Sequence, residues 1–508
     1  MTVDRESHPG RYAGASSPEP AGTHVETTIT AGTVVGVAQH GVARFLGIPY
    51  AAAPVGAHRF RDPAPAPEWA EPRDARRPGP TAPQTPYPGA LGEVLPSVEI
   101  PGEEFLNANV WAPARPTANG HPVVFWVHGG AFSRGSNALG VYDGEAFARD
   151  GVVLIAVNYR LGAEGFSVLD GVPRNLGLRD LRFALDWAIR EAPAFGGDPT
   201  RITLMGESAG GTAVAALLAM PGVAERVAGA IIQSGPLEAL PAERAGRITR
   251  AQAKHLGVPA TAAAFAEQTP AQLLEAHSAV SAGSNPVLGG PGFGLVLDPE
   301  TVPVSPAESL PGLADRVPLL IGTTEEEYRL WFVPGGLITR LTRLHLFLAR
   351  RKVGVSANAV RLFHAHRPGA SAGELLGAIA TDVLLRVPAL RLAERRRAAG
   401  ARSFLFEFGW KTPVQHLGAA HSLELGFVFD TLAAPDVRAM TGEFAPQALA
   451  DEMHAAWVAF AASGDPGWPA WSERHPVRVF GGAGEGLASD LRGDEARAIA
   501  PDLSLPAR

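Results

Sequence analysis

Short apolar runs alternate along the chain with stretches whose apolar residues recur at helical spacing. The runs have the length of buried strands and lie at residues 123–127, 152–159, 202–205, 230–232, 319–321 and 404–408. Between them, residues 179–191 and 208–220 carry the periodicity of helices. This alternation predicts an α/β fold, a mixed sheet covered by helices.

Three regions depart from this pattern. Residues 27–38 alternate threonine and valine, which predicts an exposed antiparallel hairpin. Residues 335–402 are rich in leucine, alanine and arginine, and we expect a mainly helical insertion over the sheet. Its basic stretches at 340–352 and 391–402 are interpreted as solvated helix faces. Residues 1–23 are rich in proline, glycine and serine and are expected to form a flexible tail.

Composition and charge restrict the classes of partner. The chain has 508 residues, of which 46% are hydrophobic and 19% charged, and no linker separates two halves, so we expect one domain over residues 24–508. Its formal net charge of -7 provides no general attraction to nucleic acids or anionic membranes. No apolar run approaches the roughly 20 residues of a transmembrane helix, and we expect no membrane span.

The chain has no cysteine. Disulfides, thiol redox chemistry and cysteine metal clusters are therefore excluded, and because no other ligand cluster is visible we expect neither a metal nor a cofactor. Residues 1–24 lack the basic start and apolar core of a secretory signal, so a cytoplasmic protein is predicted. The oligomeric state is left open.

The segment Gly206-Glu207-Ser208-Ala209-Gly210 follows an apolar strand and precedes an alanine-rich helix. Glycines before and after a serine permit the sharp turn that exposes a nucleophilic hydroxyl between a strand and a helix. The amides at the start of the following helix favour negative charge beside the serine. Ser208 is therefore the candidate nucleophile.

A second glycine turn follows the apolar strand at 123–127. The residues His128-Gly129-Gly130-Ala131-Phe132 can aim backbone amides at a developing negative charge, because glycine allows close approach to a ligand. We assign the amides of Gly130, Ala131 and Ala209 to a predicted oxyanion hole, with Gly129 supporting the bend.

A serine nucleophile needs a base and an acid that orients the base. His421 is the candidate base, because it lies in a loop ahead of an apolar segment. The acid is expected among Glu325, Glu326 and Glu327, which follow the apolar strand at 319–321, since α/β active sites form at the carboxyl ends of strands. The order Ser, Glu, His is that of α/β-hydrolases.

These segments resemble the type-B carboxylesterases, the family of bacterial para-nitrobenzyl esterases and of the cholinesterases. The resemblance runs from about residue 34 to 471 and includes further matching blocks at residues 45–51, 106–111, 158–162, 195–199 and 233–235. It implies the α/β-hydrolase fold, with a large, mostly parallel central sheet flanked by helices and with helical insertions. The family's Gly-Thr-x-x-Asp-Glu-Gly motif implies Glu327 as the acid; Glu326 takes the place of the Asp and remains the second choice.

The resemblance implies a serine carboxylesterase that hydrolyses small-molecule esters through an acyl-enzyme with the triad Ser208, His421 and Glu327. Activity is then expected to rise through a histidine titration at roughly pH 6 to 7. The alternatives are the same triad acting on a carbamate or amide, and a catalytically silent binding scaffold.

Further residues at family positions near the site are interpreted as supporting hydrogen-bonding groups, namely Glu207, Glu424 and Ser234. Four aromatic residues are candidates for an apolar substrate pocket: Phe132, Trp331, Phe332 and Phe429.

Overall fold

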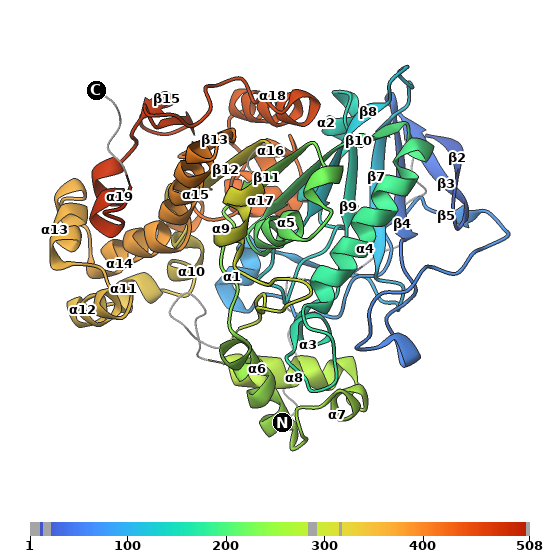
Figure 1. Cartoon of the computed structure of the whole chain (residues 1–508), viewed down its shortest axis with the longest axis horizontal. Helices are drawn as coiled ribbons and strands as arrows, with labels where there is room; N and C mark the ends of the chain where they lie inside the picture. The colour runs from blue at the N-terminus through green and yellow to red at the C-terminus, as the bar shows by residue number, and fades with distance from the viewer. Residues whose placement is uncertain (1–10, 14–21, 283–291, 314–316, 504–508) are drawn as a thin grey trace, which may run out of the picture.

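A twisted sheet runs through the computed structural model, which describes residues 11–13, 22–282, 292–313 and 317–503 (Figure 1). Within these residues the sheet has 13 strands, and its central seven are parallel to one another. In spatial order these are β14 (Pro476–Phe480), β13 (Ser403–Phe408), β12 (Leu319–Thr324), β11 (Gly229–Gln233), β10 (Gly197–Glu207), β8 (His121–Val127) and β9 (Val153–Val157). Five of the six predicted apolar runs lie within these strands, and the run at 152–159 extends beyond both ends of β9.

The two flanks of the sheet are antiparallel. Beyond β9 come β7 (Asn107–Pro113), β4 (Val42–Pro49), β3 (Gly32–Gln39) and β2 (Thr23–Ile29), and β15 (Gly486–Ser489) pairs with β14 at the other edge. The predicted hairpin is the β2–β3 pair, in which Thr28 lies opposite Thr33. The short β5 (Arg73–Asp74) pairs with β3.

The predicted tail falls mostly on residues that lie outside the described ranges. Its described part includes Arg11–Ala13, which form strand β1 parallel to β6 (Ser97–Glu99). Thr23, at the end of the predicted tail, already belongs to β2.

Alternate side chains of each parallel strand enter two different hydrophobic cores. In β8, Val123, Phe125 and Val127 pack with α4 (Leu176–Glu191) and α5 (Ala209–Ala219), whereas Val124 and Trp126 pack with α18 (Gln447–Ser463) on the other face. Successive side chains of a strand point to opposite faces of the sheet, and helices cover both faces. The central strands are therefore apolar at consecutive positions. The predicted fold class is confirmed.

Besides α4, α5 and α18, other helices lie outside residues 335–402. They are α1 (Gly89–Val94), α2 (Glu145–Arg149), α3 (Gly162–Phe166), α6 (Ala242–Leu256), α7 (Ala262–Ala266), α8 (Pro270–Ser281), α9 (Pro306–Ser309), α10 (Arg329–Phe332), α16 (Leu425–Val428), α17 (Pro435–Thr441) and α19 (Gly493–Ile499). Across the described ranges, no helix combines the length and the apolar character needed to cross a bilayer.

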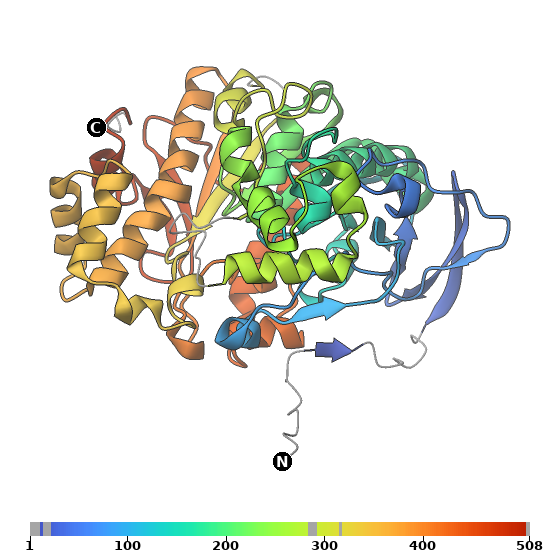
Figure 2. The ribbon, with the colours of Figure 1, turned by 90° about the horizontal axis from the view of Figure 1, so that it is seen from below.

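The region expected to be helical contains α11 (Leu337–Arg340), α12 (Arg343–Lys352), α13 (Ala357–His366), α14 (Ala372–Thr381), a π-helical turn at Asp382–Arg386 and α15 (Val387–Ala398). Figures 1 and 2 show these yellow and orange helices at the opposite end of the molecule from the N-terminal strands. Tyr328 and Phe332, which follow β12, pack into the core of this helical region. The helices are thereby attached to the segment that carries the candidate acid.

The interpretation of both basic stretches as solvated helix faces is wrong for Arg396. Its side chain is fully buried and donates hydrogen bonds to the carbonyl oxygens of Leu310 and Val317 and to the hydroxyl of Ser403. The helical periodicity did not reveal this, because the partners come from a loop before β12 and from β13. Arg343 and Arg351 on α12 are exposed, as expected.

A buried ion pair connects the end of β9 to α4. Arg160 and Asp180 both have 0% side-chain exposure, and the carboxylate accepts Nε of Arg160 at 2.8 Å, Nη2 at 2.5 Å and the backbone amide at 3.0 Å. Arg160 also donates to the carbonyl oxygen of Arg61 at 2.7 Å. Every charge of the pair is therefore compensated within the protein.

We predict that Asp180→Asn lowers the free energy of unfolding by about 3–5 kcal/mol, because it leaves the buried guanidinium of Arg160 without its counter-charge. Asp186→Asn on the same helix is the matched control; its carboxylate is 39% exposed, and the expected loss is about 0–1 kcal/mol. Urea unfolding followed by tryptophan fluorescence measures both. Equal losses would contradict the importance given to the buried pair.

Candidate active site

Ser208 occupies the turn between β10 and α5 in a strained conformation. Its φ is 55° and its ψ is -123°. A Cβ at Gly206 would lie 2.5 Å from the carbonyl oxygen of Gly210, and one at Gly210 would lie 2.1 Å from that of Val127, so this turn requires glycine at both positions. The amide of Ser208 donates to the carbonyl oxygen of Gln233 at 2.9 Å, which fixes the turn against β11. Ser208 lines the cavity described below.

Glu327 and His421 are in direct contact. Nδ1 of His421 lies 2.5 Å from Oε2 of Glu327, and both side chains are buried. The second oxygen of Glu327 accepts hydrogen bonds from the hydroxyl of Ser234 at 2.6 Å and from the amide of Thr324 at 2.8 Å. These bonds fix the carboxylate, which in turn fixes the imidazole.

Glu326, the second choice for the acid, points elsewhere. Its Oε1 accepts Nε of Arg329 at 2.8 Å, and its Oε2 accepts the amide of Ala419 at 3.2 Å. Neither oxygen contacts His421 within the described part of the chain. The geometry therefore favours Glu327 over Glu326.

The glycine turn after β8 lies beside Ser208. A Cβ at Gly129 would be 3.1 Å from Cβ of Ser208, and the carbonyl oxygen of Gly130 accepts the amide of Arg134 at 3.0 Å, which closes the turn. Among the described residues, the amides of Gly130, Ala131 and Ala209 donate no hydrogen bond. Three donors thus remain available next to the serine.

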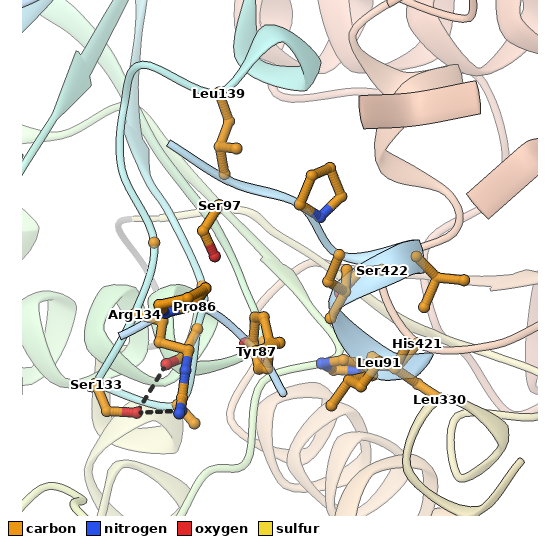
Figure 3. A pocket seen from close by; sticks show the side chains of 18 of the residues that line it. Pro86, Tyr87, Leu91, Ser97, Ser133, Arg134, Leu139, Leu330, His421 and Ser422 are labelled. Carbon is orange, nitrogen blue, oxygen red and sulfur yellow. Dashed lines mark hydrogen bonds between the residues drawn. The ribbon is translucent and has the colours of Figure 1, made fainter. Parts of the chain in front are cut away.

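Ser208 and His421 open onto one cavity of about 840 Å³. Its apolar lining comes from α1, α10, α17 and the turn after β8 and includes Leu91, Leu139, Leu330, Trp331 and Met440. In Figure 3, Tyr87 and Arg134 lie on one side of the view, and His421 lies with Leu91 and Leu330 toward the other. This volume suits a small organic ligand.

Of the four aromatic residues that were candidates for the pocket, one lines it. Trp331 lines the cavity, with its ring centroid 4.5 Å from that of His421. The pocket role is wrong for the other three candidates: Phe132, Phe332 and Phe429 are buried and pack in the hydrophobic cores against Phe166, Tyr328 and Trp126, respectively. Nearness in sequence to a catalytic segment did not show which face of the element each ring occupies.

Several lining residues were not anticipated from the sequence. Tyr87, His277 and Phe293 come from segments without a recognisable motif, and only the folded chain brings them to the cavity. Ser422, which follows the candidate base, adopts a φ of 67° and lines the cavity too.

The carboxylesterase family model matches residues 21–477. The chain is 34% identical over 469 residues to the para-nitrobenzyl esterase of Bacillus subtilis (strain 168), an alignment that covers 89% of this chain and 93% of the relative. The chain belongs to the carboxylesterase family.

Other relatives support the assignment of this carboxylesterase. It is 33% identical over 486 residues to the phenmedipham hydrolase of Pseudarthrobacter oxydans, covering 91% of this chain and 96% of that protein. The crystal structure of the Geobacillus stearothermophilus carboxylesterase EST55 at pH 6.2 superposes with a TM-score of 0.83 at 34% identity, over 93% of this chain and 99% of that chain. The protein is a carboxylic ester hydrolase with the α/β-hydrolase fold.

Two more buried carboxylates surround His421 in this carboxylesterase. Oε1 of Glu207 lies 3.1 Å from Nε2 of His421 and accepts the hydroxyl of Ser422 at 2.7 Å. Glu424 accepts Nε2 of Gln233 at 3.0 Å. Glu207 and Glu424 were expected to support the site by hydrogen bonding, and both make such bonds.

The buried environment shifts the pKa values of these groups. Burial raises the pKa of Glu207, and it raises the pKa of Glu424, beside the other carboxylates, to about 8. Burial by itself would lower the pKa of His421, but the charges of Glu207 and Glu327 outweigh it and raise that pKa to about 9. The imidazolium form is therefore favoured over a wider pH range than in an ordinary histidine.

We predict that kcat/KM rises with pH through a midpoint above 6.5 and toward 9, because protonated His421 cannot accept a proton and its pKa is raised. The midpoint of pH 6 to 7 expected from the sequence is thus displaced upward. Glu207→Gln removes a negative charge near Nε2 and should move the midpoint back toward 6.5. Glu326→Gln, whose carboxylate binds Arg329, should leave it in place. A pH–rate profile of 4-nitrophenyl acetate hydrolysis measures all three enzymes, and an unshifted midpoint in Glu207→Gln would refute this electrostatic origin.

Proposed function

We propose that this carboxylesterase hydrolyses small-molecule carboxylic esters through a covalent acyl-enzyme on Ser208. His421 is the general base and acid, Glu327 orients it, and the amides of Gly130, Ala131 and Ala209 bind the oxyanion. The observation that carries the proposal is the 2.5 Å contact between Glu327 and His421, on a cavity that Ser208 shares.

In the first half of the reaction, the hydroxyl oxygen of Ser208 attacks the ester carbonyl carbon while its proton passes to Nε2 of His421. The carbonyl oxygen becomes an oxyanion, stabilised by the three amides. When the tetrahedral intermediate collapses, the bond to the alcohol oxygen breaks, and that oxygen takes the proton from His421. The alcohol leaves and the acyl group stays on Ser208.

In the second half, a water molecule gives a proton to Nε2 of His421 and attacks the acyl carbon, and collapse returns the proton to Ser208 and releases the acid. Nε2 is suited to this role because it has no aligned hydrogen-bond partner among the described residues; Glu207 is near it without hydrogen-bond alignment. Glu327 keeps the proton of neutral His421 on Nδ1, so Nε2 remains the basic nitrogen.

Esters are proposed as substrates in preference to carbamates or amides because the family match and the para-nitrobenzyl esterase relative are both esterases. The same residues could cleave the other bonds, and a substrate panel distinguishes them. A silent binding scaffold is disfavoured, since all the proposed catalytic groups are present. The cytoplasmic location predicted from the sequence stays a prediction.

Removal of the proposed nucleophile tests the mechanism. We expect Ser208→Ala to lower kcat for 4-nitrophenyl acetate by about 10³- to 10⁶-fold, because no covalent intermediate can form. Ser278→Ala, which alters an exposed serine of the same cavity wall on α8, is the control and should keep wild-type activity. Circular dichroism verifies folding, and a Ser208→Ala enzyme with a tenth of wild-type activity would eliminate Ser208 from the mechanism.

A second pair of variants tests the acid. Glu327→Gln should lower kcat by about 10⁴-fold, because an amide at this position can force the imidazole into the wrong tautomer. Glu326→Gln changes the adjacent carboxylate, which faces Arg329, and should cost less than about tenfold. Steady-state kinetics with 4-nitrophenyl acetate compare them, and the reverse order would transfer the role to Glu326.

A further inference from the structure

Arg134 places a positive charge at the wall of the active-site cavity. It is the one arginine or lysine among the described lining residues, and it is half-buried. Its backbone amide donates to the carbonyl oxygen of Gly130, so the side chain begins at the end of the proposed oxyanion loop. A cation is thus fixed at the wall of the cavity that Ser208 also lines.

The guanidinium of Arg134 has only neutral partners in the described part of the chain. Nε donates to the carbonyl oxygen of Thr85 at 2.8 Å, Nη1 to the hydroxyl of Ser133 at 3.3 Å and Nη2 to the hydroxyl of Thr85 at 3.4 Å. The ring of Tyr87 lies 4.8 Å below it. A guanidinium has five N–H donors, so two remain unused. By contrast, the buried guanidinium of Arg160 is paired with the carboxylate of Asp180.

Among the described residues of the cavity lining, no carboxylate forms an ion pair with Arg134. The two carboxylates among the described lining residues have other hydrogen-bond partners. Glu207 accepts the hydroxyl of Ser422, and Asp436 accepts the amides of Val141 and Val437 at 2.9 and 3.2 Å. Burial, assisted by the charge of Arg134, lowers the pKa of His277 to about 4, so this neighbour is neutral at pH 7.

We propose that Arg134 binds an ionised carboxylate on the substrate, remote from the ester that is cleaved, so that the preferred substrates are anionic esters such as half-esters of dicarboxylic acids. An unpaired guanidinium in a mostly apolar cavity provides the planar donor pair that a carboxylate accepts. Neutral His277 can supply a further hydrogen bond. The cavity of about 840 Å³ has room for a substrate with two functional ends. This inference rests on the proposed function, because it concerns the substrate of the same site.

Two matched pairs of esters test the inference. In the first pair the carboxylate is on the acyl side: mono-4-nitrophenyl adipate is compared with 4-nitrophenyl hexanoate. In the second pair it is on the alcohol side: 3-(4-acetoxyphenyl)propionate is compared with its methyl ester. The pair that the wild-type enzyme discriminates identifies the side on which Arg134 binds. The readout is the ratio of kcat/KM for the anionic ester to that for its neutral partner.

We expect Arg134→Gln to lower this ratio by about 10- to 100-fold in at least one pair, mainly through a higher KM for the anionic ester, because the ion pair is lost. Arg134→Lys should restore part of the ratio, since it keeps the charge without the planar fork. Added salt should raise the KM of the anionic ester in the wild type. Arg474→Gln, an exposed arginine outside the cavity, is the control and should leave the ratio unchanged.

The possible failures are distinct. If Arg134→Gln slows the anionic and neutral esters in parallel, Arg134 only holds the loop at Thr85 and the inference is wrong. The inference is also wrong if the ratio is unchanged in both pairs. If instead neither ester of any pair is hydrolysed by the wild type, or Ser208→Ala hydrolyses them at the wild-type rate, the proposed function itself fails.

Discussion

The contact between Glu327 and His421, formed in a buried and carboxylate-rich interior, is the interaction on which the proposed chemistry depends. A carboxylate out of contact with water costs a great deal of free energy unless it is hydrogen-bonded, and Glu327 has Ser234, Thr324 and His421 as partners. Those partners come from three neighbouring regions of the carboxyl edge of the sheet. The site therefore exists only when β11, β12 and the loop before α16 are assembled.

The same edge of the sheet positions Ser208, the proposed nucleophile. The parallel strands β8, β10 and β11 bring the glycine turn, Ser208 and the carbonyl oxygen of Gln233 to one level, and the missing side chains at Gly206 and Gly210 allow α5 to start at once. The positive φ of Ser208 is sustained by packing on both faces of the sheet. The packing that stabilises the sheet therefore also holds Ser208 in position.

Much of this arrangement could be predicted from the sequence, because it rests on local patterns. Several features can be recognised within a short stretch of sequence. They are the apolar runs of strands that are buried on both faces, the glycines around Ser208 and the matching family motifs. The side chains that shape the cavity have no such short-range signal. Whether Phe132 and Phe429 face a cavity or a core depends on how separate helices pack, and Arg396 is buried by a loop that is distant in sequence. The cluster of Glu207, Glu327 and Glu424 around one imidazole likewise appears only in three dimensions, and it changes the expected pH dependence.

The most direct test of the central claim is the mass of the protein after brief exposure to a fluorophosphonate, followed by peptide mapping. An activated serine in a site with oxyanion donors should form one adduct, and the account predicts that it is on Ser208 and that it forms more slowly as the pH falls and His421 becomes protonated. A folded protein that forms no adduct, or forms one on another serine at a comparable rate, would contradict the account.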